Sequence, residues 1–103
     1  MADRLKNIHP GEVLKEEFLI PFKITQDKLA KDIGVQPIAI SQIVNRKRSI
    51  TPETALLLGK YFNVPSSFWL GLQADYDTEE ARATLGEKLK RIVPIATETP
   101  LHV

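Results

Sequence analysis

The sequence predicts an all-α fold, in which five helices pack as one small domain and a further helix follows at the C-terminal end. Apolar residues recur at spacings of three and four along most of the chain, as on one face of a helix. Capping residues and prolines stand where helices are expected to begin. No stretch shows the strict polar and apolar alternation of a strand. With 103 residues and 43% hydrophobic content, the chain can bury one modest core.

The first helix is predicted over about residues 10–20. Pro10 suits a first helical turn, where no amide donor is missed. Pro21 is expected to end the helix, because the residue before a proline is pushed away from helical angles. The buried face should carry Val13, Leu14 and Phe18, and the following connection should bury Phe22 and Ile24.

Two short helices joined by a tight turn are predicted between Thr25 and Asn45. Thr25 is a suitable N-cap, and Gly34 stands where a left-handed residue would end the first helix. Pro37 follows Gln36 at the expected start of the second helix. The core-facing stripes are Leu29, Ala30 and Ile33 on the first helix, and Ile40, Ile43 and Val44 on the second.

Three more helices are predicted after this pair. Thr51 and Pro52 mark the start of the fourth helix, and the fifth should run over residues 66–76. Asp77 and Glu80 resemble a capping box, which predicts a separate sixth helix reaching about Arg91. Apolar residues expected on these helices are Ala55, Leu56, Leu58, Phe62, Phe68, Trp69, Leu72, Tyr76, Ala81, Leu85, Leu89 and Ile92.

Composition excludes several classes of protein. The chain has no cysteine, so it can form neither disulfides nor thiolate metal sites. It has no apolar run long enough for a signal peptide or a membrane span, so we expect a cytoplasmic protein with no membrane partner. Net charge is +1, but residues 1–50 hold nine Lys or Arg against six Asp or Glu, and residues 51–103 hold five against seven. The basic half could face a polyanion, although ordinary surface charge also explains a difference of this size.

Catalysis is not expected. The two histidines, His9 and His102, are far apart in the sequence, and neighbouring glutamates such as Glu16 and Glu17 point different ways on a helix. No phosphate loop, nucleophile motif or metal-ligand spacing is present. The sequence therefore predicts no catalytic residue, no metal and no cofactor.

The second helix of the pair has a second face that could contact DNA. Pro37, Ile38, Ser41 and Gln42 lie opposite its apolar stripe. In a major groove, Ile38 could meet a thymine methyl and Gln42 could bond bidentately to adenine. The basic residues after the helix suit either its negative end or a DNA backbone. Helical hairpins are common, so a protein-interaction module that never touches DNA is an alternative.

Specific motifs support the DNA-binding hypothesis. The run T-Q-x-x-L-A-x-x-I-G-V-x(4)-I-x-x-I-x-N resembles the helix-turn-helix of phage-repressor-like (XRE) regulators. HPGEVLKEEF, RKRSITPETALLLGKYF and SSFWLGLQADYD resemble segments of the HigA antitoxins, also called virulence-associated protein I-like proteins. The resemblance covers about residues 8–78.

This resemblance implies a lambda-repressor-like domain that binds double-stranded DNA. It implies an antitoxin that dimerises on a palindromic operator, neutralises a cognate mRNA-cleaving toxin and represses its own operon. A stand-alone regulator without a toxin is the alternative. Many relatives carry Ser or Thr where Gln36 stands, and a polar or basic residue where Pro37 stands, so the operator sequence is not predicted. The implied base-reading residues are Pro37, Ile38, Ser41 and Gln42, and the implied backbone contacts are Gln26, Gln36, Asn45, Arg46 and Lys47.

Four segments are expected along the chain. Residues 1–8 should form a flexible lead, residues 9–77 the helix-turn-helix domain, residues 78–92 a C-terminal helix and residues 93–103 a flexible tail. A stripe of Ala81, Leu85 and Leu89 on the C-terminal helix could either pair two chains or fold back on its own domain.

Overall fold

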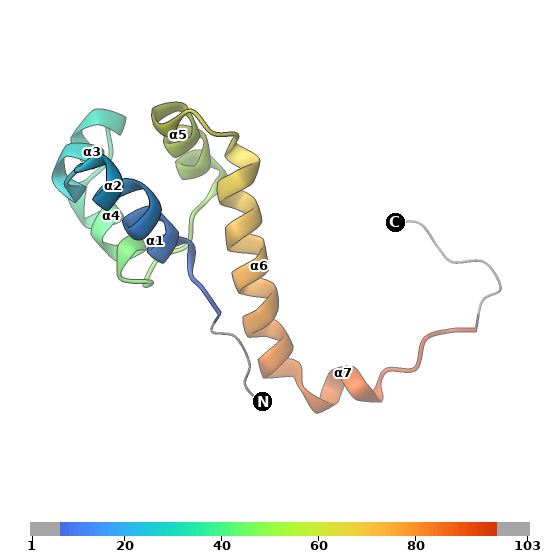
Figure 1. Cartoon of the computed structure of the whole chain (residues 1–103). Helices are drawn as coiled ribbons and strands as arrows, with labels where there is room; N and C mark the ends of the chain where they lie inside the picture. The colour runs from blue at the N-terminus through green and yellow to red at the C-terminus, as the bar shows by residue number, and fades with distance from the viewer. Residues whose placement is uncertain (1–6, 97–103) are drawn as a thin grey trace.

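The computed structural model describes residues 7–96, and these are helical with short connections (Figure 1). The predicted flexible lead and tail lie largely outside this range. Helices α1 to α5 and the first half of α6 surround one core, while the second half of α6 and α7 extend away from it. Within residues 7–96 no helix is both long and apolar enough to cross a membrane. The all-α fold predicted from the sequence is confirmed.

The first helical run is continuous and longer than predicted. It comprises α1 (Pro10–Val13), a π-helical segment η1 (Leu14–Leu19) and α2 (Ile20–Phe22). The predicted end at Ile20 is wrong, since the helix continues through Pro21. The amide of Ile20 donates to the carbonyl of Lys15, five residues earlier. This wider turn precedes the proline, whose ring and missing N–H conflict with ordinary α-helical bonding. Lys23, with φ of 58°, ends the run.

The longer run changes which side chains are buried. Leu19 is 4% exposed and belongs to the core, whereas Phe22 is 60% exposed. The prediction that Phe22 is buried is therefore wrong, because the continuing helix carries it to the rim. Its ring lies 6.1 Å from that of Phe62 and 6.3 Å from that of Phe18. Ile24 packs against the core as expected.

The predicted helix pair is present as α3 (Gln26–Ile33) and α4 (Pro37–Val44). Thr25 Oγ1 accepts a hydrogen bond of 3.0 Å from the amide of Lys28, which confirms the predicted N-cap. Gly34 ends α3 with φ of 77°, and Pro37 occupies the first position of α4. The most deeply buried side chains of the pair are Leu29, Ala30, Ile40 and Ile43.

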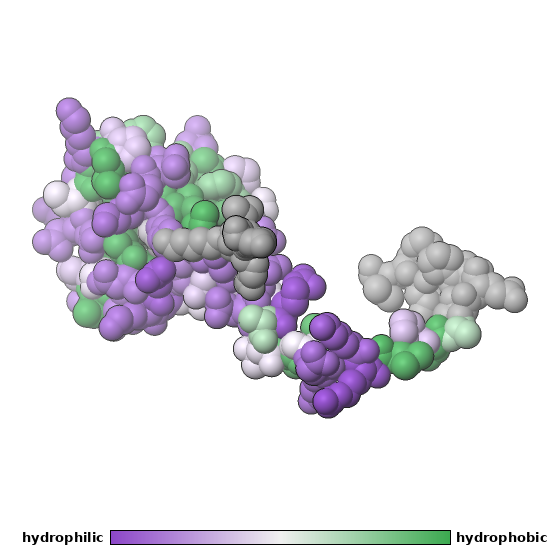
Figure 2. All heavy atoms as spheres, turned by 60° about the horizontal axis from the view of Figure 1, so that its bottom comes forward, coloured by the Kyte–Doolittle hydropathy of each residue, from purple (hydrophilic) through white to green (hydrophobic). Residues whose placement is uncertain are grey.

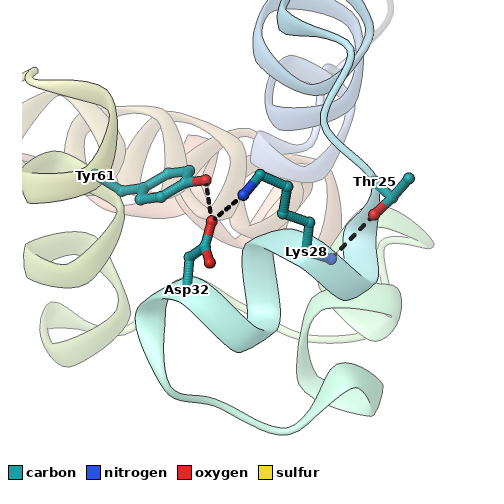
Figure 3. A network of polar contacts seen from close by, with 4 residues as sticks. All are labelled: Thr25, Lys28, Asp32 and Tyr61. Atoms are coloured by element: carbon teal, nitrogen blue, oxygen red, sulfur yellow. Dashed lines mark hydrogen bonds and ion pairs between the residues drawn. The ribbon is translucent and has the colours of Figure 1, made fainter.

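Helix α5 (Pro52–Phe62) starts as predicted, with Thr51 as N-cap. A polar contact connects it to α3: Asp32 Oδ2 accepts from the Tyr61 hydroxyl at 2.5 Å and from Lys28 Nζ at 2.9 Å (Figure 3). The hydrogen bond from Tyr61 and then that from Lys28 lower the pKa of Asp32 below its usual value. This contact links α5 to α3, the first helix of the pair.

Helix α6 (Ser66–Leu85) replaces two predicted helices. The predicted boundary at Asp77 is wrong, because Asp77 does not cap a new helix. Its Oδ1 instead accepts a 2.9 Å bond from Gln73 Nε2, one turn earlier in the same helix. Within α6 there is no proline and no residue with positive φ, and the helix ends at Gly86, which has φ of 41°. The short helix α7 (Glu87–Arg91) follows.

The first half of α6 closes the core. Trp69 is fully buried and packs against the rings of Phe18 and Phe68. Gln73, 6% exposed, accepts a 2.7 Å bond from the amide of Ile50 and so fixes the segment between α4 and α5. The buried apolar core comprises Leu14, Leu19, Leu29, Ala30, Ile40, Ile43, Ile50, Ala55, Leu58 and Trp69.

Candidate nucleic-acid interface

Helix α4 presents opposite sides to the core and to solvent. Ile40 and Ile43 are buried, at 0% and 1% exposure. Ile38 is 58% exposed although it is a large apolar residue. Pro37 is also exposed, while Ser41 and Gln42 are partly buried. The four predicted base-reading residues are therefore accessible from outside on one short helix, and the buried stripe fixes the orientation of that helix.

The residues at the start of α4 and α3 are positioned by local backbone structure. Gln36 is the N-cap residue of α4, but its side chain makes no capping hydrogen bond. Its exposed amide is therefore not engaged in holding the helix. Gln26 occupies the first position of α3, directly after the Thr25 cap, and is partly buried. Ser41 Oγ donates to the carbonyl of Ile38 at 3.4 Å, one turn earlier on α4.

The chain reverses sharply after α4. The amide of Arg46 donates to the carbonyl of Ile43 at 3.0 Å, and the amide of Lys47 donates to the carbonyl of Gln42 at 2.7 Å. These two bonds, with Arg46 in the left-handed region at φ of 64°, form a Schellman motif. The motif occurs here without the usual glycine. It places Asn45, Arg46 and Lys47 at the exposed C-terminal end of α4.

The side chain of Arg46 is engaged within the protein. Its Nη1 lies 3.2 Å from Glu12 Oε2, so the guanidinium connects the end of α4 to α1. It also lies near enough to His9 to contribute, after burial, to the lowered pKa of that imidazole. Arg46 therefore has a role in holding α1 beside α4, separate from any contact with a DNA backbone.

Sequence reasoning missed one residue at this surface. Arg48 donates from Nε at 2.9 Å and from Nη2 at 2.6 Å to the same acceptor, Gln42 Oε1. The Schellman motif brings the two side chains together by folding the chain back along α4. The sequence showed Arg48 within the basic cluster after α4, but it did not show that this arginine contacts a predicted base-reading residue.

Comparisons with known proteins agree with this geometry. A helix-turn-helix family model matches residues 14–69. Virulence-associated protein I of Dichelobacter nodosus is 40% identical over 91 residues, which cover 88% of this chain and 83% of that protein. Antitoxin HigA-1 of Vibrio cholerae is 34% identical over 85 residues, covering 82% of this chain and 80% of that protein.

A solved structure gives the same result in three dimensions. The Pseudomonas aeruginosa antitoxin HigA with the higBA promoter superposes with a TM-score of 0.85 at 36% identity, and the match covers 88% of this chain and all of that one. The family model, the relatives and the structural match all include the α3–α4 pair. The chain belongs to the helix-turn-helix family, among its HigA and virulence-associated protein I-like members.

Proposed function

We propose that this protein is a sequence-specific DNA-binding antitoxin that represses its own operon. The observation that carries the proposal is the two-sided character of α4: Ile40 and Ile43 anchor it, and Ile38 remains 58% exposed on the other side. A helix held in this way can lie in a major groove with its outer face against base edges. The similarity to an antitoxin solved with its promoter supports this use of the surface.

The predicted contacts divide into two kinds. Pro37, Ile38, Ser41 and Gln42 would meet base edges, where short, apolar and amide side chains distinguish bases. The other group would hold the phosphate backbone, through amide and basic side chains beside the two helix ends. That group comprises Gln26, Gln36, Asn45, Arg46 and Lys47.

The proposal includes a second partner and a place of action. We propose that the chain binds and neutralises a cognate mRNA-cleaving toxin in the cytoplasm, without catalysing a reaction itself. The similarity to HigA antitoxins supports this part. The alternative is a stand-alone regulator of the same fold, which would bind its operator without a toxin.

A palindromic operator requires two copies of the domain. Half-sites recognised by two-fold-related helices lie about 34 Å apart, one helical turn of DNA. We propose that the region after the core, from the second half of α6 onward, joins two chains. Leu85, Leu89 and Ile92 are 40%, 41% and 64% exposed there. Ile92, Val93 and Ile95 follow α7 and are exposed, and Figure 2 shows a hydrophobic stretch beyond the hydrophilic surface of that helix, away from the body of the molecule.

Binding to the DNA upstream of the gene tests the proposal. The wild-type chain should shift this DNA in a gel and should discriminate it from unrelated DNA of equal length. Gln42→Ala should reduce affinity for the operator by about 1–3 kcal/mol, with a much smaller effect on unrelated DNA. Lys47→Ala should weaken binding to both DNAs alike and flatten the dependence on salt. Equal loss on both DNAs for Gln42→Ala would contradict its base-reading role.

Co-purification with the product of the neighbouring gene tests the toxin partner. A stable complex that restores growth to cells expressing the neighbour would support the antitoxin proposal. Operator binding without any such complex would favour the stand-alone regulator. If the chain showed neither operator binding nor a complex, the protein-interaction module would be the remaining alternative.

A further inference from the structure

The contact between Gln42 and Arg48 restricts which atoms Gln42 can offer to a base. Both hydrogen bonds from Arg48, at 2.9 and 2.6 Å, end on Gln42 Oε1. Arginine has no acceptor atom, so the amide must turn its oxygen toward the guanidinium. An amide oxygen has two lone pairs, and the two bonds occupy both. Gln42 therefore presents its Nε2 hydrogens, which are donors, as its free polar group.

A donor-only side chain suits a different base from a free glutamine. Bidentate bonding to adenine needs one acceptor, for the N6 amino group, and one donor, for N7. With Oε1 occupied, Gln42 lacks the acceptor. The major-groove edge of guanine instead presents two acceptors, O6 and N7. The outer N–H groups of Arg48 add further donors beside the amide.

We infer that Arg48 positions Gln42 as a donor and thereby makes the position read by Gln42 specific for guanine. This inference rests on the proposed function, because it concerns the base preference of the same helix. It assigns to Arg48 a role in specificity through Gln42. The expected base is therefore guanine, whereas an isolated glutamine would favour adenine.

The backbone supports a defined arrangement of this pair. The amide of Lys47 donates to the carbonyl of Gln42 at 2.7 Å, so a backbone hydrogen bond holds the turn that brings residue 48 back toward Gln42. Arg48 is exposed and is absent from the core, so substituting it should leave the fold intact. Lys47, its neighbour, bonds Gln42 through the main chain and provides a matched basic control.

The test selects binding sites for the full-length chain from a library of randomised double-stranded DNA. The position read by Gln42 is the one whose preference disappears in Gln42→Ala. The wild type should prefer guanine over adenine there by roughly tenfold, the lower part of the range for a bidentate contact. Arg48→Ala should free Oε1 and move the preference toward adenine. Arg48→Lys keeps the charge but loses the planar fork, so it should shift the preference in the same direction.

Lys47→Ala should bind all sequences more weakly and keep the guanine preference. The inference is overturned if the wild type prefers another base at that position, if Gln42→Ala changes no position, or if Arg48→Ala weakens every sequence equally with guanine retained. A wild type that selects no sequence at all would instead refute the proposed function, and this inference with it.

Discussion

His9 shows how one side chain can connect several parts of this protein. It is 3% exposed, and its Nδ1 accepts a 2.9 Å bond from the amide of Gly11, which caps α1. Its ring lies 4.8 Å from that of Tyr76 on α6, in an edge-to-face arrangement. Burial, and then the charge of Arg46, lower the pKa of His9 below 6.5, while Asp77 and Glu12 oppose this shift. The neutral ring is therefore the form that the fold requires.

Protonation of His9 should destabilise the folded protein. Well above pH 6.5 the ring is neutral in both states, so it adds no pH dependence there. Below that value the unfolded chain takes up a proton before the folded chain does, so the free energy of unfolding should fall until the lowered folded-state pKa is reached. His9→Asn can retain the cap without titrating. Urea unfolding measured from pH 8 to 5 should therefore show that the free energy of unfolding falls more steeply for the wild type than for His9→Asn. If the two proteins gave parallel curves of free energy against pH, His9 would not be the source of the effect.

Helix α1 can approach α4 closely because residue 11 is glycine. A Cβ at this position would lie 1.8 Å from the carbonyl oxygen of Ile43 and 3.1 Å from the Cα of Val44. Both are backbone atoms, so they cannot move aside as a side chain would. The close approach also brings Glu12 within reach of Arg46. At the scale of the element, Gly11 determines how closely α1 packs against the C-terminal end of α4.

Gly11→Ala should destabilise the protein by at least about 2 kcal/mol, because overpacking against fixed backbone forces a shift of one helix. Gly71→Ala is the matched control, since Gly71 lies on α6 with no atom within 4 Å of the added Cβ. That substitution should stabilise the protein by about 0.5–1 kcal/mol through helix propensity. Chemical denaturation of both variants measures the change in the free energy of unfolding. Similar changes for the two variants would show that the α1–α4 contact is not tight.

At the scale of the whole molecule, α6 connects the core to a projecting region. Its first half buries Trp69 and Gln73, whereas residues 77–85 are exposed. Figure 1 shows the second half of α6 extending beyond the other core helices. The predicted stripe of Ala81, Leu85 and Leu89 is split by Gly86, so Leu89 lies on α7. Neither the second half of α6 nor α7 folds back over the described core. This arrangement favours pairing between two chains over the alternative of an intramolecular cover.

Charges on this projecting region should weaken the proposed dimer. Leu85→Glu with Leu89→Glu should raise the dimer dissociation constant by at least about tenfold, since each buried leucine contributes about 1.5–3 kcal/mol. Ala83→Glu is the control, because two residues along a helix turn the side chain to nearly the opposite side. Sedimentation equilibrium measures the effect. An unchanged constant for the double variant, or an equal loss for Ala83→Glu, would place the dimer interface elsewhere.

The sequence by itself determined the features that depend on neighbouring residues. Thr25 and Thr51 cap helices, Gly34 closes the turn, and the buried stripe of α4 follows from its spacing, because each effect acts within about one helical turn. These features were enough to predict the all-α fold and the exposure of Ile38.

The tertiary structure decided which of several possible partners each polar or apolar group takes. Asp77 could have capped a helix, but it accepts a bond from Gln73 within one. Phe22 could have entered the core, but the helix carries it past Pro21 to the rim. The contact of Arg48 with Gln42 arises only after the chain has reversed at Arg46. Such outcomes depend on competition between groups brought together by folding, which spacing along the sequence does not specify.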